Sequence, residues 1–380
     1  MDFDWSPEDA AFRRALVAFL AEALPPDWDE VAKDGPGSEA QVAFSHGFCG
    51  ALAARGWLTP HWPVEVGGGG ASAWRHAILG EELWSRGEPR GPQYMNVNWI
   101  GPAILRYGTE AQRRAHLPRI ARGDVIWCQG FSEPDAGSDL VALRTRAVRE
   151  GDAYVVDGTK IWTSYANHAE WCFLLARSDP SASRHRGLSV LLVPMSLAGI
   201  EVREIPSVVG ERYFHEVCFR GVRVPAEARL GPEGEGWDVV TYALQHERVG
   251  APRYARAART LDRLVAALPP AALDDPARLA RLGEARALCE AARLLSYRVV
   301  DQRARGLPPS ADANVARVAG TFAEQWVADL ALELAGADGL EAGGFADAQF
   351  RMAMTAGVAV GATEVQLDLV ASRWLGLPRG

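Results

Sequence analysis

The spacing of apolar residues divides the chain of 380 residues into three segments. In the first segment, apolar positions recur every three or four residues, beginning with a helix whose predicted cap is the hydroxyl of Ser6. The apolar face of this helix comprises Phe12, Leu16, Phe19 and Leu20. Further helices are predicted over residues 39–55, 73–86, 100–107 and 110–122. The first segment, to about residue 125, is therefore expected to be helical.

From about residue 126 the pattern changes to short runs rich in β-branched and aromatic residues, each bounded by Gly, Pro, Asp or Ser. These runs cover residues 153–156, 171–176, 188–193, 200–205 and 216–219. Because no helical sequence separates them, they predict an antiparallel β-barrel or sandwich of about 100 residues. After Gly236 the pattern is helical almost to the end. The expected fold class is α+β and multi-domain, with an N-terminal helical domain (1–125), a central antiparallel β domain (126–233) and a C-terminal helix bundle (234–380).

Composition and charge narrow the class of protein. With 48% hydrophobic and 23% charged residues, the chain resembles an ordinary soluble globular protein. The net charge of −8 argues against a nucleic-acid binder, because phosphate contacts need clustered Lys and Arg. No signal-peptide pattern and no membrane-spanning apolar run is visible, so a cytoplasmic protein without membrane insertion is expected. The cysteines are widely spaced and predict neither disulfides nor a metal site; they are Cys49, Cys128, Cys172, Cys218 and Cys289.

Two short stretches carry candidate chemistry. Residues 129–139 read Gln-Gly-Phe-Ser-Glu-Pro-Asp-Ala-Gly-Ser-Asp and combine small residues with the hydroxyls of Ser132 and Ser138. Such a loop can bring N–H groups and hydroxyls close to an anionic or carbonyl-rich ligand, because glycine lets the backbone approach. On composition alone, a connecting loop is an equally good interpretation. The second stretch, residues 158–165, reads Gly-Thr-Lys-Ile-Trp-Thr-Ser-Tyr.

Together these stretches resemble the flavin-binding signatures of the acyl-CoA dehydrogenase family. The resemblance continues through residues 224–227, 230–236, 247–248 and 375–379. It implies an enzyme that binds FAD between the β domain and the C-terminal helices and removes hydrogen from an acyl-CoA thioester. It also implies a tetramer formed through the helices, with an electron-transferring flavoprotein as the electron acceptor.

The resemblance assigns roles to single residues. Trp162 matches the tryptophan that packs against the flavin ring, Ser164 matches the hydroxyl that bonds flavin N5, and Thr163 contributes backbone. Phe131 and Ser132 are expected at the pyrimidine edge. The implied cofactor-binding set is Gln129, Phe131, Ser132, Ser138, Trp162, Thr163 and Ser164. Trp162 on its own would more often be a core residue, and the surrounding motif is what favours a cofactor role.

The reaction needs a base for the weakly acidic α-proton, and a buried carboxylate suits this task because burial disfavours its charged form. Many family members keep this base near the C-terminus, at the position of Val360, which cannot accept a proton; Glu364 lies four residues further on. A second subset keeps the base on an earlier helix, in a Glu-Arg sequence that corresponds here to Glu247 and Arg248. Ala243, Leu244, Gly250 and Ala251 give Glu247 a small apolar helix face.

Glu247 is therefore the expected catalytic base, and a Glu paired with Arg on a solvated face is the alternative. Ser138, Gln245 and Arg248 are expected to bind the CoA substrate, although Arg248 could equally be a structural ion-pair partner. His246 is expected to pack or hydrogen-bond rather than carry protons. The stretch 91–99 is expected either to line the acyl pocket or to pack.

Two departures from the family pattern suggest a partner. Residues 260–276 contain no Arg-x-x-Phe-Gly segment, which in the family binds the dinucleotide of a neighbouring subunit. Glu333 replaces a Gln and would repel the diphosphate unless a cation compensates. An α2β2 complex with a related subunit, acting on bulky acyl-CoA such as steroid side chains, is one hypothesis; a homotetramer is the other. A non-catalytic structural subunit and an acyl-carrier-protein dehydrogenase or oxidase are the alternative functions.

Overall fold

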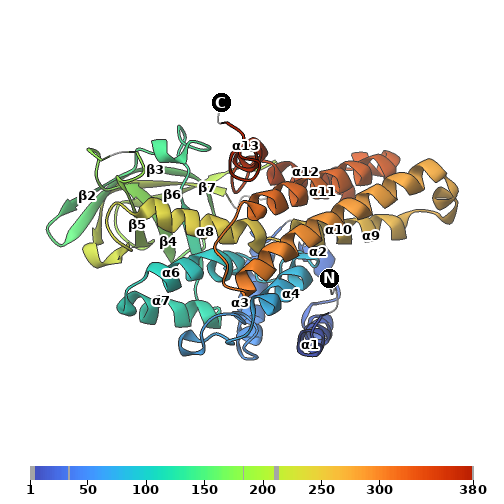
Figure 1. Ribbon diagram of the computed structural model, residues 1–380, viewed down its shortest axis with the longest axis horizontal. Helices are drawn as coiled ribbons and strands as arrows, with labels where there is room; N and C mark the ends of the chain where they lie inside the picture. Colours follow the sequence, from blue (N-terminus) through green and yellow to red (C-terminus); the bar gives the residue numbers. More distant parts are fainter. Residues whose placement is uncertain (1–4, 33–34, 183, 209–213, 379–380) are drawn as a thin grey trace. The chain divides into compact units, whose positions relative to one another are not determined.

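The computed structural model describes residues 5–32, 35–182, 184–208 and 214–378, which fall into two compact units (Figure 1). The helical unit comprises residues 1–35, 71–89 and 248–380, and the sheet unit comprises residues 36–70 and 90–247. The expected α+β class is confirmed. The expected boundaries near residues 125 and 233 remain a prediction. Arg379, which closes one of the resembling stretches, lies outside the described residues.

The helical unit is built from helices whose apolar faces pack on one another. Its helices are α1 (Pro7–Ala23), α2 (Trp28–Ala32), α4 (Ala73–Trp84), α9 (Arg253–Ala267), α10 (Pro276–Ala304), α11 (Asp312–Leu334), α12 (Phe345–Ala356) and α13 (Thr363–Arg373). The short 3-10 turn η5 (Pro270–Asp274) lies between α9 and α10, and η6 (Gly336–Leu340) lies between α11 and α12. The predicted cap is present, since the Asp9 N–H donates to Ser6 Oγ at 3.1 Å. Phe12, Leu16 and Leu20 are buried as expected, whereas Phe19 is half-buried.

The core of this unit lies among α9, α10 and α11, which pack side by side (Figure 1). Alanines at the contacts, such as Ala257, Ala285 and Ala323, let the helices approach closely, with leucines filling the space between them. A buried carboxylate adds a polar junction to this packing. Glu81 of α4 accepts hydrogen bonds from Tyr254 Oη at 2.9 Å and Tyr297 Oη at 2.8 Å.

The sheet unit contains an eight-stranded sheet with the order β6-β7-β3-β2-β4-β5-β8, and β1 pairs with β4. Its strands are β1 (Trp127–Gly130), β2 (Arg146–Glu150), β3 (Ala153–Ser164), β4 (Trp171–Arg177), β5 (Leu188–Pro194), β6 (Ile200–Ile205), β7 (Phe214–Pro225) and β8 (Arg229–Leu230). The predicted runs at 171–176, 188–193 and 200–205 thus correspond to β4, β5 and β6. The run 153–156 and the Lys-Ile-Trp stretch form the single strand β3.

The sheet is mixed and not wholly antiparallel as expected. β1 runs parallel to β4, with Cys128 opposite Cys172, and a bridge between Arg146 and Arg177 joins β2 to β4 in parallel. Strand direction depends on which distant segments pair, and the local pattern does not encode it. The sequence also gave no sign of β2, because only Ala147 of this charged strand is buried.

Helices flank the sheet within the same unit. They are α3 (Glu39–Ala53), α5 (Gln93–Met95), the π-helical turn η2 (Asn96–Ile100), α6 (Gly101–Tyr107), α7 (Glu110–Arg122) and most of α8 (Gly236–Gly250), with 3-10 turns η1 (Val64–Val66), η3 (Leu140–Ala142) and η4 (Ala226–Ala228). All five cysteines of the chain are described, and each is a buried thiol that forms no disulfide. Within the described ranges, no helix is both long enough and apolar enough to cross a membrane.

Candidate functional site

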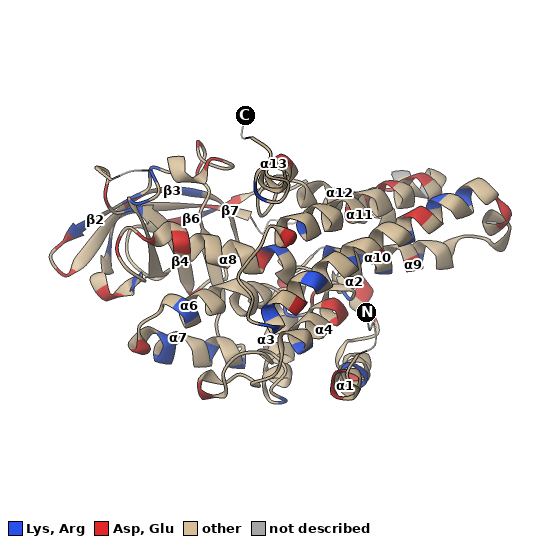
Figure 2. Ribbon diagram, in the orientation of Figure 1, with Lys and Arg blue, Asp and Glu red and all other residues tan. Residues whose placement is uncertain are grey.

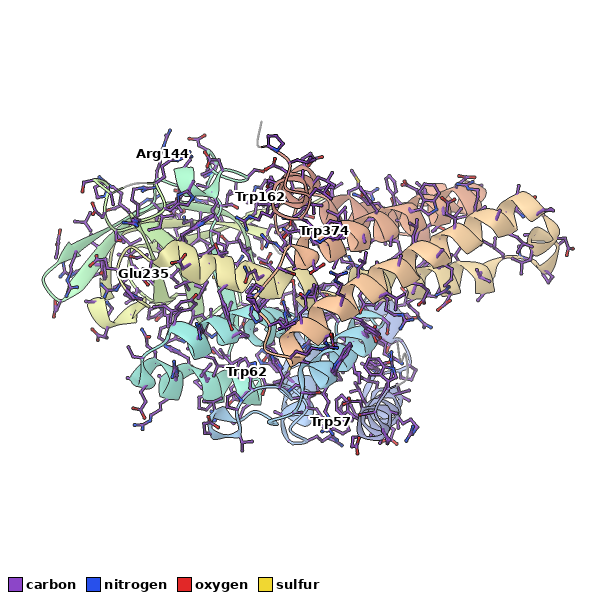
Figure 3. The ribbon with its side chains drawn as sticks, viewed as in Figure 1. Trp57, Trp62, Arg144, Trp162, Glu235 and Trp374 are labelled. Atoms are coloured by element: carbon purple, nitrogen blue, oxygen red, sulfur yellow. The ribbon has the colours of Figure 1, made fainter. Side chains whose placement is uncertain are left out.

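The two sequence motifs meet in the sheet unit, where the Ile161 N–H donates to the Ser132 carbonyl at 2.9 Å. β1 ends at Gly130, and the loop of residues 131–139 (the 131–139 loop) leads from it towards η3. On β3 the pairing with β7 is interrupted by a bulge between Lys160 and Thr163. Within this bulge Trp162 has a φ of 58°, a left-handed backbone conformation that is uncommon for a bulky residue. Its indole is 56% exposed (Figure 3). The bulge thus presents a large aromatic face to the outside of the unit.

The predicted cofactor residues differ in their exposure. Phe131 is buried, with its ring 5.9 Å from that of Phe173, and Thr163 is fully buried. Ser132 and Ser164 are half-buried. Gln129 already has a partner, because its side-chain oxygen accepts a hydrogen bond from Trp99 Nε1 at 2.8 Å. Ser138 is exposed, at the far end of the 131–139 loop.

These residues fit a flavin ring. An exposed aromatic face, half-buried hydroxyls and a glycine-containing loop form one edge of the sheet unit. The hydroxyl oxygen of Thr163 is buried and has no hydrogen-bond partner within the part of the chain that the structure describes. A buried polar atom of this kind is costly unless a ligand or solvent satisfies it.

Glu133 lies in the first motif and Lys160 in the second, and no role was predicted for either residue. Lys160 is fully buried, and its Nζ lies 2.8 Å from Glu133 Oε1. Burial by itself raises the pKa of Glu133, but the Lys160 ammonium and the hydrogen bonds from residues 144 and 145 outweigh it, so this pKa lies below its usual range. The available signal was a Lys and a Glu placed inside otherwise apolar and small-residue motifs.

Helix α8 carries the predicted base. Its start is pressed against β5, since a Cβ on Gly236 would lie 2.6 Å from the Ser189 Cα. Val239, Val240 and Ala243 are buried along its inner face. Further along, the ring of Tyr242 lies edge-on to that of Tyr107 at 5.7 Å. These contacts fix the first turns of α8 within the sheet unit.

The last turn of α8 holds the other predicted site residues. Glu247 is half-buried, and its Oε2 atom is buried. Gln245 is also half-buried, and so is Arg248, which begins the next part of the helical unit. His246 donates a hydrogen bond from Nδ1 to the Tyr242 carbonyl at 3.0 Å, and its ring packs against the Tyr242 ring at 4.4 Å with a tilt of 44°, as expected for a packing residue. Glu247 and the flavin motifs thus belong to one compact unit but to different elements.

Many family members keep the base at the position of Val360, and this side chain cannot accept a proton. Val360 lies between α12 and α13 with a φ of 63°. Its carbonyl accepts a hydrogen bond from Gln366 Nε2 at 3.3 Å, and Arg317 Nη2 holds the neighbouring Ala359 carbonyl at 2.7 Å. Glu364 is exposed on the first turn of α13. No carboxylate from residues 357–364 is therefore buried in this turn.

The expected repulsion between Glu333 and a diphosphate is offset within the helical unit. Glu333 pairs with Arg281, whose Nη2 lies 2.8 Å from Glu333 Oε2. This hydrogen bond lowers the pKa of Glu333 below its usual value. A compensating cation is thus present, supplied by α10, which the sequence could not indicate because the two residues are 52 positions apart.

The stretch 91–99 packs firmly in the sheet unit. Asn96 bonds the Val125 carbonyl at 2.6 Å and accepts from the Trp127 N–H at 3.2 Å. Trp99 reaches Gln129, as described above, and its ring lies 5.4 Å from that of Tyr94. A packing role is therefore evident, and a π-helical turn such as η2 is often found beside functional sites.

Comparison with known protein families identifies the chain. Its residues 6–124 match the acyl-CoA dehydrogenase N-terminal domain, residues 128–222 the middle domain and residues 234–375 the C-terminal domain. The chain belongs to the acyl-CoA dehydrogenase family. Acyl-CoA dehydrogenases are FAD-dependent oxidoreductases, so both the predicted enzyme class and the predicted cofactor are confirmed.

Two similar proteins of known name come from Mycobacterium tuberculosis. The chain is 34% identical over 379 residues to the acyl-CoA dehydrogenase IpdE1 of Mycobacterium tuberculosis, covering 97% of each chain. It is 36% identical over 330 residues to the acyl-CoA dehydrogenase FadE34 of the same organism, covering 87% of this chain. That match spans only 46% of the length of FadE34.

Two solved structures of similar proteins are two-component complexes. One is described as the Tcur3481-Tcur3483 steroid ACAD and shares 33% identity with a TM-score of 0.91. The other is the ChsE4-ChsE5 complex from Mycobacterium tuberculosis, with 32% identity and a TM-score of 0.86. Both alignments cover 100% of this chain and 100% of the matched chain.

Proposed function

We propose that this acyl-CoA dehydrogenase removes hydrogen from the α and β carbons of an acyl-CoA thioester, with Glu247 as the catalytic base. The observation that carries the proposal is the burial of a Glu247 carboxylate oxygen on α8, while residue 360 is Val and Glu364 is exposed. A carboxylate withdrawn from water suits abstraction of a weakly acidic α-proton. FAD, when bound, accepts the β-hydrogen as hydride.

The chain's own residues supply binding and orientation in this proposal. Trp162 offers the face against which the flavin ring packs, and Ser164 with Thr163 and the 131–139 loop supplies its polar contacts. Ser138, Gln245 and Arg248 hold the CoA part of the substrate. Glu247 receives the α-proton on its carboxylate.

Replacing the base tests the assignment. Glu247→Gln is expected to lower kcat for acyl-CoA oxidation at least about a hundredfold, because the amide cannot accept the α-proton. The amount of bound FAD and the melting temperature should stay as in the wild type, and Glu364→Gln serves as the matched control with normal activity. Unchanged activity of Glu247→Gln in the assembled enzyme would contradict the assignment and favour the non-catalytic subunit.

We further propose an α2β2 complex with a related subunit, a bulky acyl-CoA such as a steroid side-chain ester as substrate, and an electron-transferring flavoprotein as acceptor. Two observations support a partner: two of the similar solved structures are two-component complexes, and residues 260–276 lack the Arg-x-x-Phe-Gly segment. The charge of Glu333 no longer counts as support, because Arg281 compensates it. Comparing CoA with carrier-protein thioesters, and measuring oxygen consumption, distinguishes the carrier-protein dehydrogenase or oxidase.

A further inference from the structure

A buried ion pair joins the two flavin motifs. Lys160 is 0% exposed, and the side chain of Glu133 is 8% exposed. They are 27 positions apart in sequence, one on β3 and the other in the 131–139 loop. Burying two charges costs several kcal/mol per ion before their attraction is counted. A pair of apolar residues could fill this space at lower cost, so the charged groups need a reason to be present.

The polar atoms of this pair hold three separate backbone segments. Lys160 Nζ donates to the Phe131 carbonyl at 2.9 Å as well as to Glu133. Glu133 Oε1 accepts the Thr145 N–H at 2.8 Å, and Glu133 Oε2 accepts the Arg144 N–H at 2.6 Å. The side chain of Arg144 itself extends outward (Figure 3). One ion pair thus fixes the start of the 131–139 loop, the segment after η3, and β3.

Backbone contacts complete the same junction. The Ile161 N–H donates to the Ser132 carbonyl at 2.9 Å, in the position where the β3–β7 pairing is interrupted. Glu133 and Ala136 exchange two backbone hydrogen bonds, of 2.9 and 3.0 Å, which close the turn of the loop. The bulge that presents Trp162 therefore begins at the residues that anchor the loop.

Packing leaves the ammonium little freedom to move. A Cβ on Gly130 would lie 3.4 Å from Lys160 Cγ and 3.0 Å from Cys172 Sγ, so the lysine stem runs against the glycine backbone. A Cβ on Gly158 would lie 2.6 Å from the Thr145 Cα, so the third segment is close to β3 as well. The Lys160 ammonium can reach the Phe131 carbonyl and the Glu133 carboxylate only while the 131–139 loop keeps its position.

We propose that Lys160 and Glu133 are positioning residues that set the 131–139 loop and the Trp162 bulge in the spacing that the flavin ring requires. The inference rests on the proposed flavin site. The inference gives the ion pair a function. Without the ion pair, the 131–139 loop can open away from β3, and the flavin ring loses its contacts with the loop while the fold persists.

The test compares four forms of the protein, purified with any subunit that assembles with it. They are the wild type, Lys160→Met, Glu133→Gln and the matched control Glu233→Gln. Glu233 bonds Tyr154 Oη at 3.1 Å and Arg229 Nη1 at 3.2 Å in the same unit, so its loss removes an ion pair outside the flavin motifs. Lys160→Met keeps the apolar stem, and Glu133→Gln is the milder change should Lys160→Met fail to fold.

Two readouts separate positioning from general stability. Hydrogen exchange of the amides of Thr145 and Ile161 is measured in the flavin-free protein, and is expected to be at least tenfold faster in Lys160→Met and Glu133→Gln. The affinity of both variants for FAD and for FMN is measured by flavin fluorescence. It is expected to fall at least about tenfold, because the ion pair and the bound flavin stabilise the same position of the loop. FMN reports on the ring site alone, because it lacks the adenosine half. Glu233→Gln should match the wild type in both.

The outcomes are distinct. Unchanged exchange at Thr145 and Ile161 would show that the ion pair does not hold the 131–139 loop against β3. Faster exchange with unchanged flavin affinity would show that the pair stabilises the fold but does not position the flavin ring. Either result overturns this inference and leaves the proposed function standing. A wild-type protein that binds neither flavin, with or without a partner, would overturn the proposed function and this inference together.

Discussion

At the scale of single residues, two positions, one in each unit, hold backbone conformations that side chains rarely adopt. Trp162 and Val360 both have positive φ angles, of 58° and 63°. Such strain persists only where surrounding contacts determine it, and it concentrates at binding sites. Around Trp162 those contacts are the bulge of β3 and the anchored 131–139 loop. At Val360 they are hydrogen bonds from Arg317 and Gln366 to neighbouring carbonyls.

A glycine substitution tests the close packing behind the bulge. Gly158 has a φ of 152°, and a Cβ there would come within 2.6 Å of the Thr145 Cα. Gly158→Ala is therefore expected to lower the free energy of unfolding by about 2 kcal/mol or more, measured by urea denaturation. Gly137→Ala is the control, because a Cβ there meets nothing within 4 Å. Equal stability of the two variants would contradict the packing described.

At the scale of elements, buried polar groups decide how helices and strands are joined. In the helical unit, Glu324 of α11 pairs with two arginines of α9, Arg256 and Arg253, the latter at 2.9 Å. Burial by itself raises the pKa of Glu324, but the two guanidinium groups outweigh it and hold the pKa below its usual range. In the sheet unit, His116 of α7 packs edge-on against Trp127 of β1 and Trp171 of β4.

The buried ion pair should matter far more than an exposed one. Glu324→Gln leaves two arginines without their carboxylate and is expected to cost about 3 kcal/mol of unfolding free energy. Glu333→Gln removes the exposed bond to Arg281 and should leave stability almost unchanged, because solvent screens such pairs. Chemical denaturation of both variants provides the measurement. A small change in unfolding free energy for Glu324→Gln would mean that water reaches the ion pairs of Glu324 with Arg253 and Arg256.

The histidine junction predicts a pH dependence. Burial, with a smaller effect from Arg119, lowers the pKa of His116 to about 4 from 6.5. The folded state thus binds the proton less readily than the unfolded state, so stability is full above pH 6.5 and is lost as the pH falls towards 4.

His116→Phe keeps the aromatic packing and removes the proton site. Between pH 7 and pH 5 the wild type is expected to lose about 2 kcal/mol more unfolding free energy than His116→Phe. Urea denaturation at a series of pH values measures this difference. Parallel pH profiles for the two proteins would show that His116 is not buried in its neutral form.

At the scale of the whole molecule, charge and composition fit an enzyme with small-molecule substrates. Acidic and basic residues are interspersed along the helices and strands (Figure 2), and the net charge is −8. The family places FAD-dependent chemistry on this chain, and two similar solved structures are two-component complexes.

Flavin stoichiometry tests the proposed partner. The chain is expected to retain less than one FAD per subunit when purified alone, and more when co-expressed with a related subunit, because residues 260–276 lack the Arg-x-x-Phe-Gly segment. Absorbance of the bound flavin and the mass of the complex provide the measurement. One FAD per subunit in the chain purified alone would exclude the α2β2 proposal.

The sequence by itself determined most of the elements, the α+β class and the family. Local signals suffice for this: the Ser6 cap begins α1, short continuous apolar runs form β4 and β5, and the two flavin motifs are contiguous stretches. It also located the acidic residue proposed as base, since Val360 excludes the other position. These features depend on residues close together in the chain.

Only the tertiary structure decided how distant residues combine. It paired β1 with β4 in parallel, placed Arg281 beside Glu333, and brought Lys160 to Glu133 in the interior of the sheet unit. None of these follows from a local pattern, because each joins residues at least 27 positions apart whose charges and strand directions are compatible with many other pairings. Burial then selects among those pairings, since an unpaired charge in the interior is too costly to persist.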